Sequence, residues 1–305
     1  MNILVTGATG YIGTRLTDAL VGQGHAVSAL SRDAERAQRQ LPQLQQAHQW
    51  RPAEVAPSPD VFEDIEAVVH LAGERLPIGH VTAGRARKLG ANRLTVLRRL
   101  IEGIEQADDT PRTLVVAGAV GYYGDHGDDP LVEDDPPGDS LLSRGLVEYE
   151  SEAMRAGRHG LKVAVVRNGL VIGPGKGCGF LDANLPLYRM GLGGPMGSGR
   201  QWWPWVHVDD VVGIQILALH GDLEGPVNAT APEPVRQKEF ARTLGRAVRR
   251  PAFMPAPSFM VRLIAGQVAG EVLGSKRVMP RRALESGYEF RFPDLEPALT
   301  DALSS

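Results

Sequence analysis

The sequence feature that most constrains the fold is a glycine-rich turn close to the N-terminus, formed by Gly7, Gly10 and Gly13. A β-branched run, NILVTG, leads into the turn, and apolar residues with helical spacing follow it from Tyr11 to Val21. In such a unit the first glycine permits a tight turn, the second lets the backbone approach a pyrophosphate, and the third lets helix and strand pack closely. The N–H groups of the helix N-terminus also attract anions. The pattern predicts dinucleotide binding; the alternative is an ordinary glycine-rich turn between a strand and a helix.

The end of the second predicted strand, AVSAL, indicates which dinucleotide is bound. Proteins that bind NAD usually place an acid there, whereas an arginine accommodates the 2′-phosphate of NADP. Ser31 and Arg32 follow this strand, and a guanidinium can hold a phosphate through two charge-assisted hydrogen bonds. Asp33 comes one residue later and could instead cap the next helix. We therefore expect NADP (NADPH) as the cofactor rather than NAD.

Strand-like and helix-like segments alternate through the first half of the chain. The apolar runs are continuous, which is typical of parallel strands covered on both faces. The expected fold class is α/β: a Rossmann-like doubly wound parallel sheet with a small mixed C-terminal substrate lobe. The Gln-rich part of residues 33–60 is expected to be a loose helix. The expected strands are NILVTG, HAVSALSR, AVVHLAG and TLVVAGAVG, and KVAVVRNGLVIG (Lys162–Gly173) is expected to be a strand that runs into a loop.

Composition changes after Gly173, where two glycine-rich stretches are too irregular for core strands. We expect residues 1–173 to form the NADP-binding domain, to which residues 206–230 return. Residues 174–205 and 231–305 are expected to form the small C-terminal lobe.

Composition and charge exclude several classes of function. The formal net charge is −3 and no arginine stripe has interleaved aromatic residues, so nucleic-acid binding is not expected. Cys178 is the only cysteine, which excludes an internal disulfide and a thiolate zinc site. The chain has no basic leader and no apolar run of about eighteen residues, so neither a signal peptide nor a membrane span is expected. We expect a cytoplasmic monomer or homodimer with a small-molecule substrate and no metal.

Longer stretches resemble a known superfamily. TGATGYIG, HLAG, the helix with Asn92, and WVHVDDV are similar to the extended short-chain dehydrogenase/reductases, the group of NAD(P)-dependent epimerases and dehydratases. AVGYYGDHGDDPLVEDDPPGD, RMGLGGPMGSGRQWWPWVHVDD and GYEFRFPDLEPAL resemble its YfcH and SDR39U1 subgroup. The resemblance implies a Rossmann-like domain with a small C-terminal lobe that closes over the nicotinamide. It implies cofactor contacts at Gly7, Thr9, Gly10, Tyr11, Ile12, Gly13, Ser31, Arg32, Leu71, Ala72, Gly73 and Asn92, with Arg93 as a further candidate.

The three catalytic residues of the superfamily are absent from the expected positions. Its members use a tyrosine for proton transfer and a lysine one helical turn later, which lowers the pKa of the tyrosine and holds the ribose. A serine or threonine on the preceding strand orients the substrate. Depending on the alignment, the serine, tyrosine and lysine positions hold Ala119 or Gly118, Leu142 or Leu141, and Leu146 or Gly145.

The remaining candidates lie on two loops. Tyr122 is a weak catalytic candidate, whereas Tyr123 is expected to pack structurally. The candidate substrate residues are Tyr122, Arg200, Trp202 and His207, because aromatic rings and an arginine suit an anionic or planar molecule. The alternative is that the tryptophans of this segment, among them Trp203 and Trp205, anchor the lobe. Asp209 and Asp210 resemble the superfamily acid that caps the following helix.

Two functions remain open. The first is an NADP-dependent oxidoreductase or epimerase-like enzyme of unknown substrate, with nucleotide-sugar-like molecules among the candidates. Its proton would come from water or from a residue such as Tyr122. The alternative is a non-catalytic NADP-binding regulatory or sensor protein. The missing triad favours the alternative, and the glycine-rich, aromatic cleft favours the enzyme.

Overall fold

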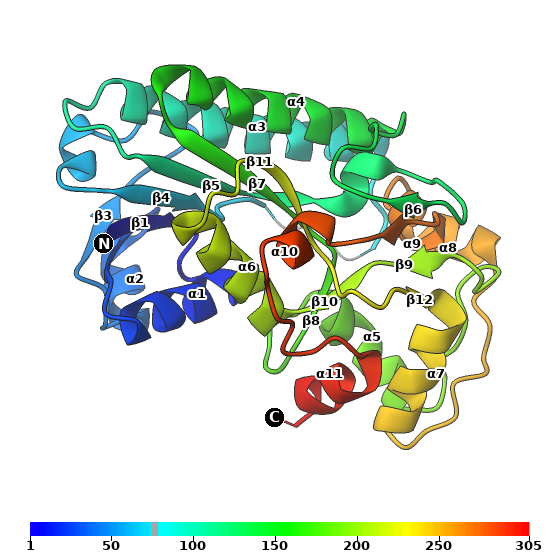
Figure 1. The fold of residues 1–305 in the computed structure, drawn as a ribbon. Helices are drawn as coiled ribbons and strands as arrows, with labels where there is room; N and C mark the ends of the chain where they lie inside the picture. The colour runs from blue at the N-terminus through cyan, green and yellow to red at the C-terminus, as the bar shows by residue number, and fades with distance from the viewer. Residues whose placement is uncertain (75–78, 305) are drawn as a thin grey trace.

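The structure is a computed structural model that describes residues 1–74 and 79–304. Its centre is a sheet of seven strands in the order β11-β7-β5-β4-β1-β2-β3, with every neighbouring pair parallel (Figure 1). The chain runs outward from β1 in one direction and then from β4 in the other, so the strand order reverses between β1 and β4. Ligands of such sheets bind outside the carboxyl ends of the strands at this point. The strands are β1 (Asn2–Thr6), β2 (Ala26–Ser31), β3 (Gln46–Gln49), β4 (Ala67–His70), β5 (Thr113–Ala119), β7 (Lys162–Asn168) and β11 (Gly225–Ala229).

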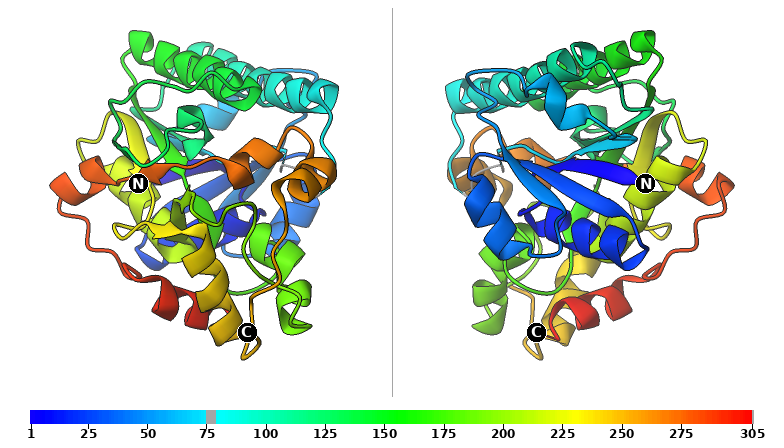
Figure 2. Two further views of the ribbon diagram at one scale, coloured as in Figure 1. Left: turned by 90° about the vertical axis from the view of Figure 1, so that its right-hand side faces the viewer. Right: turned by 90° about the vertical axis from the view of Figure 1, so that its left-hand side faces the viewer.

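Helices cover both faces of the sheet (Figures 1 and 2). The helices α3 (Ala83–Glu105) and α4 (Leu141–Arg155) lie side by side on one face. The other face carries α1 (Tyr11–Gly22), α2 (Ala34–Gln40) and α6 (Val208–His220). This arrangement confirms the expected Rossmann-like α/β fold class.

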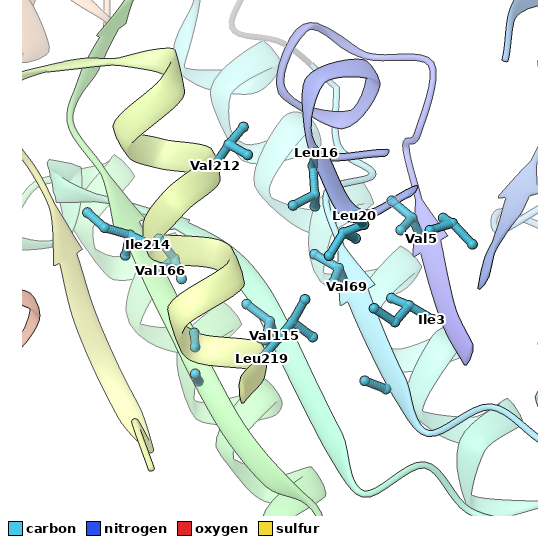
Figure 3. Close-up of a cluster of buried hydrophobic side chains, with 14 of the residues drawn as sticks. Ile3, Val5, Leu16, Leu20, Val69, Val115, Val166, Val212, Ile214 and Leu219 are labelled. Carbon is cyan, nitrogen blue, oxygen red and sulfur yellow. The ribbon is translucent and has the colours of Figure 1, made fainter. Parts of the chain in front are cut away.

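The two faces bury separate apolar cores, because successive residues of a strand point to opposite sides. Figure 3 shows one core, in which Leu16 and Leu20 of α1 meet sheet residues such as Val69. The neighbouring Val68 belongs to the second core, beneath α3 and α4, with Leu97. Fully buried strands of this kind explain the continuous apolar runs in the sequence.

Most of the remaining elements are short and lie at the carboxyl edge of the sheet and beyond it (Figure 1), whereas the 3₁₀ turns that lead into β4 and β7 lie at the opposite edge. Trp203, Trp205 and Phe240 are buried in a third core, which also includes Leu295 and Leu299 near the end of the chain. The paired short strands are β8 (Leu170–Ile172) with β10 (Trp205–His207), β9 (Trp202–Trp203) with β12 (Val235–Arg236), and β6 (Pro130–Leu131) with β13 (Arg277–Val278). The helices are α5 (Phe180–Arg189), α7 (Gln237–Ala247), α8 (Ser258–Ala265), α9 (Ala269–Leu273), α10 (Arg281–Glu285), α11 (Leu295–Ala302) and the 3₁₀ turns η1 (Pro59–Phe62), η2 (Val120–Tyr123) and η3 (Ala156–His159).

Two expected elements differ in the structure. The segment Lys162–Gly173, expected to be a strand that runs into a loop, forms β7 and, after Gly169, a second short strand, β8. A Cβ at Gly169 would lie 2.3 Å from the Pro204 carbonyl oxygen, so only glycine fits between the two strands. The Gln-rich segment holds only the seven-residue α2, and its second half is the edge strand β3. An edge strand exposes half of its residues, which leaves no apolar run to reveal it.

Candidate functional site

The glycine turn between β1 and α1 is closed by close backbone contacts. Gly7 has φ of +75°, and its carbonyl accepts a hydrogen bond of 2.9 Å from the Gly10 N–H. A Cβ at Gly13 would lie 2.2 Å from the Gly7 carbonyl oxygen, so only glycine fits there. Gly10 precedes α1 without any side-chain cap, which leaves the N–H groups of the first helical turn available to an anion.

A cavity of about 1170 Å³ opens over this turn at the carboxyl edge of the sheet. One end is formed by Ser31, Arg32 and residues 50–54, and the other by Arg93, Ala117, Val171 and residues 177–179. All twelve expected cofactor residues line this cavity: Gly7, Thr9, Gly10, Tyr11, Ile12, Gly13, Ser31, Arg32, Leu71, Ala72, Gly73 and Asn92. The volume is that of a large small-molecule site.

At the β2 end of the cavity, Arg32 is available to a ligand, whereas the carboxylate of the neighbouring Asp33 is hydrogen-bonded to a helix. Asp33 caps α2, where its carboxylate accepts a hydrogen bond of 2.9 Å from the Arg36 N–H. Arg32 is exposed on the cavity wall beside Ser31. This end therefore offers a cation and a hydroxyl to a ligand.

At the β4–β5 end, the cavity wall carries Arg93, and the buried His70 lies behind it at the end of β4. The His70 ring is fully buried, and its Nδ1 lies 2.8 Å from the Thr6 hydroxyl. Burial, and secondly the charge of Arg93, lower the pKa of His70 to about 3, so the ring is neutral. Arg93 donates a hydrogen bond to the Ala117 carbonyl and stacks over the Tyr149 ring, with 4.5 Å between its Cζ and the ring centroid.

The two tyrosines after β5 have different environments. Tyr123 is fully buried; its hydroxyl donates to Asn228 at 2.8 Å and accepts from Arg167 at 2.7 Å. Burial raises its pKa to about 12, against the opposing effect of Arg167, so Tyr123 has a structural environment. Tyr122 is half-buried, and the Arg167 guanidinium covers its ring at 3.6 Å. Neither tyrosine lines the cavity described above.

Arg167 belongs to a buried ion pair that the sequence did not reveal. It donates two hydrogen bonds from its Nε and Nη2 to Glu150 on α4, at 3.0 and 2.8 Å, and both side chains are at least nine-tenths buried. Glu150 lies on the helix aligned with the catalytic helix of the superfamily. The pair connects β7, α4 and the turn that carries Tyr122 and Tyr123.

The positions expected for the catalytic triad carry apolar side chains. Ala119 is the last residue of β5, and Leu142 and Leu146 lie on α4. A Cβ on Gly121 would lie 3.3 Å from the Leu146 Cδ1 and 3.0 Å from the Glu271 Oε2. Glu271, on α9, forms an ion pair of 3.3 Å with the buried Lys276, so the C-terminal lobe brings a charged pair to this edge of the sheet. Glu271 is 150 positions from Gly121 and 125 positions from Leu146 in the sequence, so no local pattern could predict that it lies near them.

The candidate substrate residues do not form one site. Trp202 is stacked by Arg236 and Arg277, with Cζ-to-centroid distances of 3.9 and 5.0 Å, and its Nε1 donates to Asp128. Arg200 is exposed beside it, and its carbonyl accepts a hydrogen bond from Arg236. Neither lines the cavity, and the substrate role of these two residues and of Tyr122 remains a prediction.

The expectations for His207 and its neighbours are corrected. His207 is wholly buried, with its Nε2 3.1 Å from Asp301 and its Nδ1 accepting from the Asp209 N–H at 3.2 Å. The ring cannot reach a substrate in this structure, because it caps α6 and packs against Phe292. Because His207 is the cap of α6, Asp210 does not have the capping role expected for it. The Asp210 carboxylate accepts instead from the N–H groups of Arg291 and Phe292 at 2.7 and 3.0 Å.

Three further observations concern the remaining residues. Cys178 lines the cavity, but burial raises the pKa of its thiol, which donates to the Val171 carbonyl. Within residues 1–74 and 79–304, no group of three or more His, Cys, Asp or Glu side chains could hold a metal ion. Across the same described residues, no helix is both long and apolar enough to span a membrane.

A parallel sheet with a glycine turn at its centre and a cavity over the switch point defines a Rossmann-like nucleotide-binding protein. A family model described as the NAD dependent epimerase/dehydratase family matches residues 3–229, and the chain belongs to this family. A model described as a domain of unknown function (DUF1731) matches residues 256–302.

Relatives that match along nearly the whole chain show which type within the family it resembles. The chain is 34% identical to the mouse "Epimerase family protein SDR39U1", with all of both chains covered. It is 32% identical to "Epimerase family protein YfhF" of Bacillus subtilis, over 100% of this chain and 98% of the relative. The crystal structure of human SDR39U1 (isoform 2) with NADPH superposes with a TM-score of 0.85 and 34% identity, over 99% of both chains. The resemblance to the SDR39U1 type of extended short-chain dehydrogenase/reductases is thereby confirmed.

Proposed function

We propose that this protein binds NADPH in the cavity and acts as an oxidoreductase or epimerase-like enzyme on a small molecule. The main observation in support of this proposal is that all twelve expected cofactor residues line one cavity over the glycine turn. The human relative, 34% identical over 99% of both chains, was crystallised with NADPH, which supports the same cofactor here.

The residues present fit the cofactor. The close approach at Gly13 and the uncapped start of α1 leave backbone N–H groups to hold a pyrophosphate. Arg32 and Ser31 would hold the 2′-phosphate, since Asp33 is committed to α2. Leu71, Ala72 and Gly73 would lie along the adenosine ribose and pyrophosphate. When bound, the cofactor supplies hydride chemistry.

Proton transfer needs a different source from that of the superfamily, because in either alignment the expected triad positions have no side chain that can transfer a proton. These positions hold Ala119 or Gly118, Leu142 or Leu141, and Leu146 or Gly145. Tyr122 and water are the proposed donors for a substrate at the carboxyl edge of β5. Nucleotide-sugar-like molecules, aldehydes and ketones are the classes to test. Products must be resolved as well as absorbance, since an epimerisation leaves the reduced nicotinamide unchanged overall.

The second candidate is a non-catalytic NADPH-binding regulatory or sensor protein. The apolar side chains at the three triad positions favour it. Tight NADPH binding without turnover of any compound in such a panel would support this candidate over the enzyme.

The cofactor proposal predicts that Arg32→Glu reverses the preference between NADPH and NADH. We expect at least a tenfold loss of NADPH affinity, about the value of one hydrogen-bonded charge pair, with little change for NADH. Nicotinamide fluorescence titrations measure both affinities. Arg36→Glu is the matched control, because Arg36 is exposed on α2 and does not line the cavity. Equal affinity of the wild-type protein for NADH and NADPH would contradict the proposal.

A further inference from the structure

Arg93 is the cationic side chain at the β4–β5 end of the cavity. It extends from α3 between two structural contacts: the Ala117 carbonyl on β5, to which its Nη2 donates, and the Tyr149 ring on α4. Its Nε lies 4.0 Å from the position that a Cβ on Gly73 would occupy. The guanidinium is thus held at the carboxyl ends of β4 and β5, on the cavity wall.

One N–H donor of the Arg93 guanidinium has no acceptor in the described part of the protein. Its Nε is buried and has no hydrogen-bond acceptor among the residues that the structure describes. A buried donor of a charged group is costly unless a partner satisfies it. An acceptor supplied by a ligand in the cavity would remove that cost.

The nearby carboxylates do not neutralise Arg93. Glu150 is committed to Arg167 through the buried ion pair. Glu74, which also lines the cavity, is paired with Arg85. Arg93 therefore places its positive charge on the cavity wall, where it also acts on the Glu150 carboxylate.

The two ends of the cavity differ in chemistry. The β2 end, with Ser31 and Arg32, fits the adenosine half of the cofactor and its 2′-phosphate. The glycine turn at the start of α1 lies between the ends and fits the pyrophosphate. Arg93 is at the opposite end, where the nicotinamide half follows.

We propose that Arg93 binds the ribose on the nicotinamide side of NADPH, in place of the superfamily lysine, whose expected position holds Leu146 or Gly145. Adjacent ribose hydroxyls offer acceptors to the fixed N–H donors of a guanidinium. The arginine reaches the site from α3, whereas the superfamily lysine comes from the helix that corresponds to α4. The inference rests on the proposed binding of NADPH.

Three ligands locate the contact: NADPH, 2′-phospho-ADP-ribose and 2′-phospho-ADP. All three carry the 2′-phosphate and the diphosphate, but 2′-phospho-ADP lacks the second ribose. For Arg93→Met we expect about tenfold weaker binding of NADPH and 2′-phospho-ADP-ribose, and unchanged binding of 2′-phospho-ADP. Calorimetric titration measures all three dissociation constants without any turnover.

Two control variants complete the experiment. Arg98→Met, on the same helix, removes a side chain that is 54% exposed and pairs with Glu152, and it should leave all three affinities unchanged. Arg93→Lys retains the charge but not the fixed N–H donors, so it should recover only part of the lost affinity. Unchanged 2′-phospho-ADP binding also shows that the variant is folded.

Other results would overturn the inference. If Arg93→Met bound NADPH with the same affinity as the wild-type protein, Arg93 would not contact the ribose. Equal weakening of all three ligands would assign Arg93 to the pyrophosphate or to the structure of the site. Failure of the wild-type protein to bind NADPH would contradict the proposed function itself, on which the inference rests.

Discussion

His70 ends β4 at the centre of the sheet, and its whole side chain is buried. Its Nδ1 faces the Thr6 hydroxyl on β1, and Thr6 in turn accepts from the Ala72 N–H at 3.2 Å. The histidine thus connects the two strands between which the strand order reverses. The HLAG sequence marked this strand end, but only the structure shows that the ring is a buried polar link.

The lowered pKa of His70 predicts a pH dependence of stability. The folded protein keeps the ring neutral down to about pH 3, because burial and then Arg93 disfavour its charged form, whereas the unfolded chain binds a proton below about pH 6.5. This contribution is fully present above pH 6.5 and is lost as the pH falls towards 3, at up to about 1.4 kcal/mol per unit. Urea unfolding between pH 7 and pH 4.5 measures it.

His70→Asn is the comparison for that measurement, since an amide can still bond to Thr6 but does not titrate. We expect its free energy of unfolding to depend less steeply on pH than that of the wild-type protein. Parallel pH profiles for the two proteins would show that His70 does not titrate between folded and unfolded states as expected.

The unit formed by β1, the glycine turn and α1 was the most predictable part of the chain. The helix was expected from Tyr11 to Val21 and is observed from Tyr11 to Gly22. By contrast, α3 begins at Ala83, where Thr82 caps it by accepting from the Arg85 N–H, whereas the amphipathic pattern in the sequence begins only at Asn92. Its first two turns bury few apolar residues, so periodicity alone did not reveal them. A local apolar pattern therefore predicts a helix only where the apolar side chains of that helix are part of the core.

Two glycines of α1 allow a matched test of this unit. Gly13→Ala would place a Cβ 2.2 Å from one backbone oxygen and 2.8 Å from another, so the backbone must move. We expect a loss of about 2 kcal/mol in the free energy of unfolding, together with weaker NADPH binding. Gly22→Ala meets no atom within 4 Å and should stabilise the helix by up to about 1 kcal/mol. Chemical denaturation compares the two; equal effects would refute the packing argument.

The C-terminal segment is attached to the sheet domain through buried polar contacts on α6. Asp210 is fully buried and accepts from Tyr288, Arg291 and Phe292. His207, at the start of the same helix, reaches Asp301 on α11. The paired aspartates suggested a helix cap because sequence shows only their neighbours along the chain. Their partners are about 80 residues further on.

Asp210→Ala should therefore destabilise the whole molecule. It leaves two backbone N–H groups without their acceptor and removes the carboxylate acceptor of the Tyr288 hydroxyl, which keeps only the Asp210 backbone carbonyl, so we expect a loss of about 2–4 kcal/mol in the free energy of unfolding. Asp209→Ala is the control, because Asp209 is 32% exposed and its ion pair with Arg291 is near the surface. Urea unfolding and proteolysis within residues 288–294 report both variants. Similar losses in the two would rule out a special role for Asp210.

The sequence by itself determined the parallel sheet and the glycine turn, whereas the full set of twelve expected cofactor residues, all of which line the cavity, came from the resemblance to the superfamily. The sheet and the turn follow from local rules: fully buried strands are continuously apolar, and a close backbone approach requires glycine. Only the tertiary structure decided which polar groups meet. Arg93 reaches β5 from α3, Arg167 pairs with Glu150 on α4, and Glu271 approaches Gly121 from the C-terminal lobe. Such contacts join residues far apart in the chain, and no periodicity or spacing records them, because they depend on how the helices and the lobe pack against the carboxyl edge of the sheet.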